Sequence, residues 1–173
     1  MVKEINKEYL KKNQYSTTKY LDARIKIHQF TKNKIGFHEW IFNQYNLSEF
    51  EKNKDEIKIL DVGCGVAHLH TFLSNQGWSG KYLGFDPNKK AIDLVDESIN
   101  AMHGTIEDLG ELAEWNRFDW VIANGVFNLG LKEEHSFWII DHMISHANKG
   151  IIFNMLQAPY PDSNYVAYYP EQI

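Results

Sequence analysis

Two hydrophobic patterns follow one another along the chain and change near residue 54. Residues 1–54 carry apolar residues at the spacing of one helix face, which predicts short helices. The polar run Asn53–Glu56 then gives way to short apolar runs separated by turns rich in Gly, Asn and Asp. We therefore expect an N-terminal helical cap over 1–54, a main domain over 55–156 and a C-terminal tail over 157–173.

The main domain alternates strand-like and helix-like segments. Short apolar runs predict strands at 57–60, 82–85, 101–103, 118–123 and 150–156. Helical spacing, with Gly and Pro as stop and start signals, predicts helices at 66–76, 89–98, 109–115 and 133–147. This alternation predicts an α/β fold, a doubly wound and mostly parallel sheet with helices on both faces.

Composition and charge narrow the classes of partner. The 173 residues are 43% hydrophobic and 14% aromatic, which is enough for one core. Eighteen Lys and Arg against 23 Asp and Glu give a net charge of -5, so nucleic acid is not expected as a partner. A single cysteine excludes an internal disulfide framework, and no apolar run has the length of a membrane span or signal peptide. We expect a cytoplasmic protein without a membrane partner.

The first predicted strand runs into a glycine turn and then a helix. Gly63 and Gly65 can adopt φ values closed to other residues and allow a ligand to approach the backbone, while the helix start offers N–H groups. A dinucleotide turn would have a third glycine where His68 stands, and Asp61 would repel a pyrophosphate but accept hydrogen bonds from an ammonium group. A nicotinamide-dependent oxidoreductase therefore stays an alternative, but a disfavoured one.

A second acidic residue ends the next predicted strand. Asp86 follows Gly65 by 21 positions, where a carboxylate can hold the two hydroxyls of an adenosine ribose. The same residue precedes Pro87, which suits the first turn of a helix, so Asp86 could instead be the N-cap of that helix. Both roles are compatible.

The segment Asp61–Ala67 resembles the first motif of class I S-adenosylmethionine (SAM)-dependent methyltransferases, acid-x-Gly-x-Gly-x-Gly/Ala. Three further segments are similar to motifs of the same family in the same order: the Asp86 acid, the adenine loop His103–Leu109 and the fourth strand Phe118–Asn124. In the adenine loop Ile106 matches the apolar position, whereas Thr105 stands where many members have Asp.

The resemblance implies strand order 3-2-1-4-5, SAM across the carboxyl ends of the first two strands, and in-line methyl transfer to an unidentified, small-molecule or metabolite acceptor. It also implies a set of cofactor-binding residues: Asp61, Gly63, Cys64, Gly65, Asp86, Pro87, Ile106, Glu107 and Asn124. Arg24 in the N-terminal segment is a candidate for the cofactor carboxylate. A non-catalytic SAM-fold module acting as a partner subunit is the remaining alternative.

Neither a catalytic base nor a metal site is assigned. Sulfonium is a good leaving group, so holding donor and acceptor in line can suffice. Cys64 is isolated, and the eight histidines lack a carboxylate cluster with ligand spacing. Complete domains of the family add a helix and an antiparallel hairpin, yet 17 residues follow Leu156. We expect a truncated sheet that lacks this hairpin and self-associates through its fifth-strand edge.

Overall fold

The computed structural model describes residues 38–39, 56–111, 117–129 and 131–155. The chain divides into two compact units, Met1–Lys52 and Asn53–Ile173, and the elements below belong to the second. Of the expected N-terminal helices, the described residues include His38 and Glu39, which are helical. The domain boundaries drawn from the sequence stay a prediction, as does the absence of a hairpin after the fifth strand.

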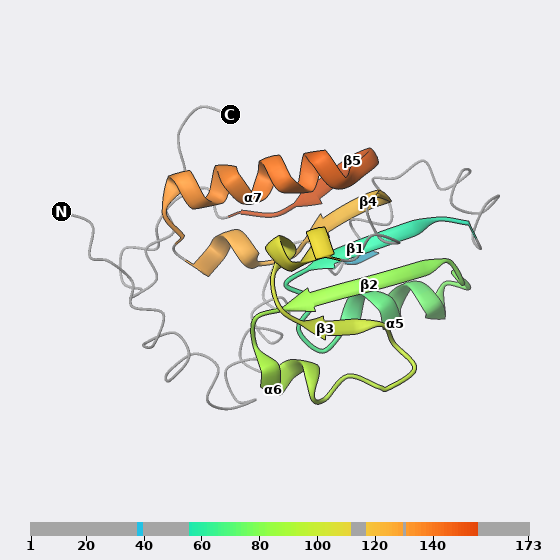
Figure 1. Cartoon of the computed structure of the whole chain (residues 1–173). Helices are drawn as coiled ribbons and strands as arrows, with labels where there is room; N and C mark the ends of the chain where they lie inside the picture. Colours follow the sequence, from blue (N-terminus) through green and yellow to red (C-terminus); the bar gives the residue numbers. More distant parts are fainter. Residues whose placement is uncertain (1–37, 40–55, 112–116, 130, 156–173) are drawn as a thin grey trace, which may run out of the picture. The chain divides into compact units, whose positions relative to one another are not determined.

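Five strands form one sheet that is parallel throughout (Figure 1). They are β1 Lys58–Val62, β2 Lys81–Asp86, β3 Ala101–His103, β4 Phe118–Ala123 and β5 Ala147–Phe153. Their order is β3-β2-β1-β4-β5, which confirms the predicted fold class. In a sheet of this order the carboxyl ends of β1, β2 and β4 lie side by side, and ligands bind at this edge in open α/β folds.

Helical segments connect the strands on both faces. The α-helices are α5 His68–Asn75, α6 Lys89–Ile92 and α7 Glu133–His146, and the 3₁₀ helices are η3 Ile106–Glu111 and η5 Val126–Leu129. In Figure 1, η3 and α7 lie in front of the sheet and α5 lies behind it. The α7 helix contacts β4, β5 and η3.

The predicted helix at 89–98 is wrong in its extent. After Ile92 the backbone hydrogen bonds change to the 3₁₀ pattern, in which the N–H groups of Leu94 and Val95 donate to carbonyls three residues back. Asp96 then accepts hydrogen bonds from the Ser98 N–H at 2.9 Å and the Ser98 hydroxyl at 2.6 Å. An Asp side chain that binds nearby backbone in this way competes with helix formation, so α6 stays short.

The other boundaries also shift. The fifth strand begins at Ala147 and not at 150, because Ala147 already pairs with Phe118 of β4. The next pairing is Trp120 with Gly150, so β5 carries one more residue than β4 over this stretch, which is a β-bulge. The helix expected at 109–115 is replaced, within the described residues, by the 3₁₀ helix η3.

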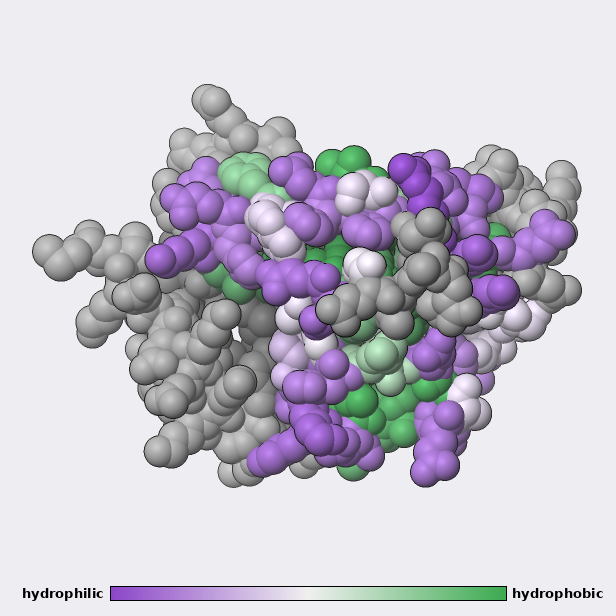
Figure 2. Space-filling model, in the orientation of Figure 1, coloured by the Kyte–Doolittle hydropathy of each residue, from purple (hydrophilic) through white to green (hydrophobic). Residues whose placement is uncertain are grey.

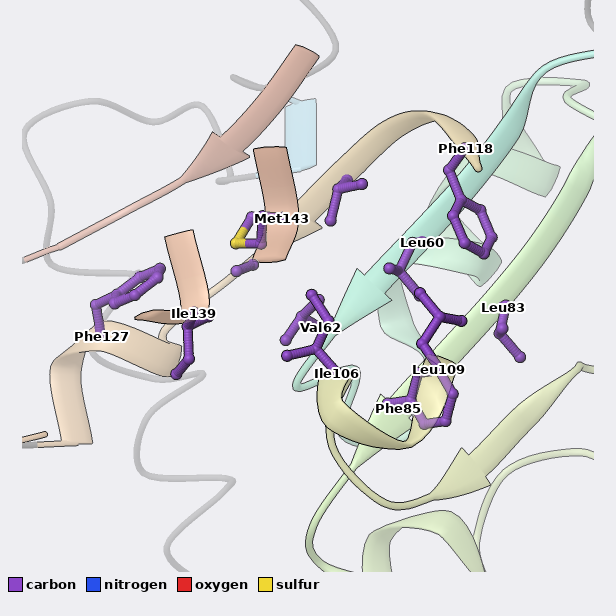
Figure 3. Close-up of a cluster of buried hydrophobic side chains, with 12 residues drawn as sticks. Leu60, Val62, Leu83, Phe85, Ile106, Leu109, Phe118, Phe127, Ile139 and Met143 are labelled. Atoms are coloured by element: carbon purple, nitrogen blue, oxygen red, sulfur yellow. The ribbon is translucent and has the colours of Figure 1, made fainter. Parts of the chain in front are cut away.

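The main core lies between the sheet and the segments η3 and α7 (Figure 3). Alternate residues of β1 and β2 supply Leu60, Val62, Leu83 and Phe85, since side chains alternate between the faces of a strand. From the other side come five apolar residues: Ile106, Leu109, Phe127, Ile139 and Met143. This packing fixes η3 and α7 on one face and leaves the carboxyl edge of the sheet to be built by the connecting loops.

Intervening residues of the same strands face α5. They include Ile59 and Asp61 of β1 and Tyr82 and Gly84 of β2, all of them buried. Polar residues predominate on the face of the molecule that Figure 2 shows, with smaller apolar areas between them. No helix within the described ranges is long and apolar enough to cross a membrane.

Candidate functional site

The glycine turn after β1 is fastened to the carboxyl end of β2. The N–H groups of Gly63 and Cys64 both donate to the Phe85 carbonyl, at 2.7 and 3.0 Å. The Gly65 N–H donates to Asp86 Oδ2 at 2.8 Å. Three backbone donors of one loop thus meet the last two residues of the neighbouring strand, which holds the loop and the Asp86 carboxylate in one arrangement.

The two glycines of the turn are required for different reasons. Both have left-handed φ values, +72° at Gly63 and +57° at Gly65. A Cβ on Gly63 would lie 2.5 Å from Val126 Cγ2, whereas a Cβ on Gly65 would meet no described atom within 4 Å. Gly63 therefore makes room for the loop after β4, whereas no described atom lies where a side chain at residue 65 would stand. Ligand access at the two glycines stays a prediction.

Asp86 is a buried carboxylate, 9% exposed, that accepts two backbone hydrogen bonds. Its Oδ2 accepts from Gly65 and its Oδ1 from the Asn88 N–H at 2.7 Å. Burial raises the pKa of Asp86, while these two hydrogen bonds and the charge of His103 lower it. The N-cap of α6 is Asn88, whose side chain accepts from the Lys90 N–H, so the N-cap role considered for Asp86 is wrong.

Asp61 lies beneath the turn on the α5 face of the sheet and is 3% exposed. The Tyr82 hydroxyl donates to its Oδ2 at 2.7 Å, in a fully buried contact. Burial raises the pKa of Asp61 to about 7, and the charge of Asp86 adds to this rise, against the lowering effect of the Tyr82 hydrogen bond. Near neutral pH this carboxyl is therefore poised between its two protonation states, and a nearby cation would favour the charged one.

Cys64 is buried and packs against β2. A Cβ on Gly84 would lie 2.7 Å from Cys64 Sγ, so the absence of a side chain at residue 84 makes room for the thiol. Burial raises the pKa of the thiol far above its ordinary value, with the charges of Asp61 and Asp86 adding to the rise. The Cys64 side chain is thus a packed, protonated group of the turn.

The loop after β3 places Ile106 in the core, 3% exposed, against β1 and β2. The Thr105 N–H donates to Asp108 Oδ2 at 2.7 Å, which closes the start of η3, and Glu107 is exposed. A Cβ on Gly104 would lie 2.5 Å from the same Asp108 oxygen. The loop is therefore held by its own polar groups.

The ends of β4 and β5 are joined through two asparagines. Asn154 Oδ1 accepts from the Gly125 N–H at 2.6 Å, and Asn154 Nδ2 donates to Asn124 Oδ1 at 3.0 Å. Ala123 and Phe153 are the last paired residues of their strands, so both asparagines lie at the carboxyl edge of the sheet.

A family model described as a methyltransferase domain matches residues 53–157. The chain belongs to this family. The class recognised from the glycine turn is thereby confirmed, together with the enzyme class, a SAM-dependent methyltransferase, and its cofactor, SAM.

Solved methyltransferase structures have the same fold. Magnesium protoporphyrin IX methyltransferase from Synechocystis PCC 6803, with bound SAM, is 18% identical, with 92% of this chain and 80% of that chain covered and a TM-score of 0.57. The plantazolicin methyltransferase BpumL, in complex with a pentazolic desmethylPZN analogue and S-adenosylhomocysteine (SAH), is 16% identical, with 83% of this chain and 56% of that chain covered and a TM-score of 0.59. A search of curated proteins finds no match.

Within this methyltransferase fold, the structure brings most of the predicted site residues to one edge. Asp61, Gly63, Cys64 and Gly65 form or support the glycine turn, and Asp86 is bonded to it. Pro87 is exposed just beyond Asp86, and Asn124 lies after β4. Arg24 lies outside the described residues.

Sequence reasoning missed three residues that act on this edge: Tyr82, His103 and Asn154. Strand alternation could have found Tyr82, since Tyr82 and Gly84 share one face of β2 and Gly84 pairs with Asp61. Asn154 required the register between β4 and β5, which the sequence does not show.

The described part of the chain contains no group of three or more His, Cys, Asp or Glu residues that could hold a metal ion. Three histidines of α5 and α7 have contacts within the protein. His70 packs on Trp78 and Tyr82, and the Nδ1 atoms of His142 and His146 are hydrogen-bonded to carbonyls of their own helix. These contacts supply no base to the carboxyl edge of the sheet.

Proposed function

We propose that this methyltransferase transfers the methyl group of SAM to a small-molecule or metabolite acceptor bound beside the carboxyl ends of β1 and β4. The observation that carries the proposal is the hydrogen bond that joins the Gly65 backbone to the Asp86 carboxylate, at a glycine where an added side chain would meet no described atom within 4 Å. The net charge of -5 disfavours nucleic acid as the acceptor. The solved relatives named above act on magnesium protoporphyrin IX and plantazolicin, which are not nucleic acids.

The residues of this edge fit the parts of SAM. Each oxygen of Asp86 accepts one backbone hydrogen bond and retains acceptor capacity for the ribose hydroxyls. The Gly65 backbone offers close approach, since a side chain at residue 65 would occupy the open space. The ammonium group of the cofactor would favour the charged form of Asp61, whose pKa is raised to about 7 in the protein alone. Glu107 and Pro87, which are exposed beside this edge, would lie at the rim of the site, and Ile106 supports the adenine loop from the core.

The contribution of the chain to the reaction is to orient the methyl donor and the acceptor relative to each other. When bound, SAM would supply the methyl group of its sulfonium: the acceptor atom would bond to the methyl carbon as the carbon–sulfur bond breaks, leaving SAH. The rigid turn and Asp86 hold the donor, and the edge formed by Asn124 and Asn154 lines the side where an acceptor approaches. Positioning of this kind can supply several kcal/mol of the barrier, roughly the scale of proximity effects.

The test is calorimetric titration with SAH, followed by incubation with SAM labelled in the methyl group and a small-molecule fraction of cell extract. We expect SAH binding and label transfer to a compound of low molecular mass. Binding without transfer to any fraction would instead favour the non-catalytic module. The absence of SAH binding would contradict the proposed site.

A further inference from the structure

The hydrogen bonds around Asn154 determine the orientation of two side-chain amides. The Gly125 N–H can only donate, so the atom of Asn154 that faces it must be the carbonyl Oδ1. The amide nitrogen of Asn154 therefore faces Asn124, and this nitrogen must in turn find an acceptor. Asn124 presents its Oδ1 to Asn154 at 3.0 Å. One backbone donor thus fixes both amides without ambiguity.

This orientation decides which group of the Asn124 amide is left for another partner, the oxygen or the nitrogen. Because Asn124 Oδ1 accepts from Asn154, the Asn124 Nδ2 and its two N–H donors are left for another partner. Within the described ranges no protein acceptor is hydrogen-bonded to this nitrogen, although Asn124 is half-buried. A ligand bound at this edge would desolvate this donor, which favours a ligand group that accepts hydrogen bonds, because an unpaired donor is costly to desolvate.

We propose that Asn154 is a positioning residue that holds the Asn124 amide with its N–H groups toward the bound ligand and so selects an oxygen acceptor, a carboxylate or a carbonyl, at this point. The inference rests on the proposed placement of SAM at the carboxyl edge. The oxygen can belong to the methionine carboxylate of SAM or to the methyl acceptor, and the two sources are separated by experiment.

Two aspartate variants test the polarity directly. In Asn124→Asp the bond from Asn154 Nδ2 is kept, since an oxygen still accepts it, but the N–H donors are replaced by an oxygen. In Asn154→Asp the Gly125 N–H is still accepted, but the second oxygen now requires a donor, so the Asn124 amide turns over and presents its Oδ1 to the ligand. Both variants thus leave the strand ends bonded and reverse the group that the ligand meets.

The measurements are the affinity for SAH, the affinity for 5′-methylthioadenosine, which lacks the amino-acid carboxylate, and methyl transfer from labelled SAM to a small-molecule extract. If the oxygen is the cofactor's, both variants bind SAH roughly tenfold more weakly or worse, the scale for a charged hydrogen bond, and bind methylthioadenosine as the wild type does. If the oxygen is the acceptor's, SAH affinity is unchanged and methyl transfer falls by a similar factor.

Control experiments distinguish a reversed amide from two other effects, the added negative charge and the loss of a purely structural contact. Asn148→Asp adds the same charge at the exposed amino end of β5 and should change nothing. Repeating the titrations at high salt screens the added charge but leaves an inverted amide inverted. If Asn154 only braces the strands, Asn154→Ala lowers the melting temperature and weakens binding while Asn154→Asp is neutral.

Unchanged SAH binding and unchanged transfer in both aspartate variants would overturn the inference. A neutral Asn154→Asp beside a harmful Asn154→Ala would overturn it as well. Failure of the wild type to bind SAH would instead contradict the proposed function, so the two failures are distinguishable.

Discussion

Asp61 and Asp86 are two buried aspartates at the same edge of the sheet, and their hydrogen-bond partners differ. Asp86 receives two backbone N–H groups, which favour its charged form against the effect of burial. Asp61 accepts a hydrogen bond from one hydroxyl and is more deeply buried, and its pKa is raised to about 7, so both protonation states are populated near neutral pH. We therefore predict that the Asp86 carboxylate binds hydroxyl groups of a ligand and that a nearby cation shifts Asp61 toward its charged form.

Replacing Asp86 by Ala should weaken SAH binding by about 1.5 kcal/mol or more, which is roughly tenfold or more in the dissociation constant. The physical reason is the loss of acceptors for the ribose together with the loss of the Gly65 anchor. Isothermal titration calorimetry measures the change. Asp93→Ala removes an exposed carboxylate of the adjacent segment and is the matched control. Equal affinities for Asp86→Ala and Asp93→Ala would remove Asp86 from the site.

The raised pKa of Asp61 predicts a pH dependence of stability. Because the pKa in the folded protein is about 7 and the ordinary value is 3.8, the folded chain holds this proton more tightly than the unfolded chain. The contribution is fully present below pH 3.8 and is lost as the pH rises toward about 7.

Asp61→Asn should remove this dependence, because an amide does not ionise. The measurement is the free energy of unfolding from urea titrations between pH 4 and 8, for the wild type and for Asp61→Asn. The difference between the two curves isolates Asp61 from groups that titrate elsewhere, such as the exposed Asp96, whose pKa is lowered by hydrogen bonds from Ser98. Parallel curves would show that Asp61 is charged throughout.

Helices and strands could be predicted from the sequence where the hydrophobic spacing and the turn residues agree with the strand pairing of the fold. Short apolar runs separated by glycine-containing turns predicted the five strands of the sheet, because buried parallel strands are short apolar runs. The helix at 89–98 was over-extended because Asp96 offers its side chain to the backbone, a competition that apolar spacing does not report. The start of β5 was missed because pairing with Phe118, through a bulge, extends the strand beyond its apolar run.

Some residues of the candidate site could likewise be predicted from the sequence, whereas others could not. Gly65 and Asp86 could be named because motif spacing places them at adjacent strand ends. The need for glycine at residue 63 was inferred for a ligand, whereas the neighbour it accommodates is Val126, more than 60 positions away along the chain. Contacts between the ends of distant strands depend on register and on loop paths, which a single sequence does not determine.

The contact between the turn and η5 can be tested with a pair of variants. Gly63→Ala should destabilise the fold by about 1–3 kcal/mol, through overpacking against Val126 and a left-handed φ. Val126→Ala removes the atom in conflict, so the double variant should recover part of this loss, leaving the φ strain. Thermal and urea unfolding measure the coupling.

Gly65→Ala is the matched comparison, since residue 65 has a similar φ but no described neighbour. It should cost less stability than Gly63→Ala and lower SAH affinity more. Additive effects of Gly63→Ala and Val126→Ala would show that the two residues do not compete for the same space.

At the scale of the molecule, the two edge strands of the sheet, β3 and β5, differ in length and composition. The β3 edge is three residues long, whereas β5 has seven residues and includes Ile151, Ile152 and Phe153, which are half-buried. In the described part of the chain β5 pairs with β4 on one side and with no strand on the other. A longer apolar edge is the better template for pairing with a second chain.

We therefore predict that the chain self-associates reversibly through β5. Sedimentation velocity over a hundredfold range of protein concentration should show a sedimentation coefficient that rises with concentration. Ile152→Lys places a charge on this edge strand, a device by which natural proteins prevent edge pairing, and should shift the chain toward monomer. Gln76→Lys adds the same charge at an exposed position after α5, outside β5, and should leave association unchanged. Thermal unfolding of both variants checks that the fold is kept. A wild-type chain that sediments as a monomer at every concentration, or an Ile152→Lys variant that is folded and associates as before, would show that β5 is not the contact.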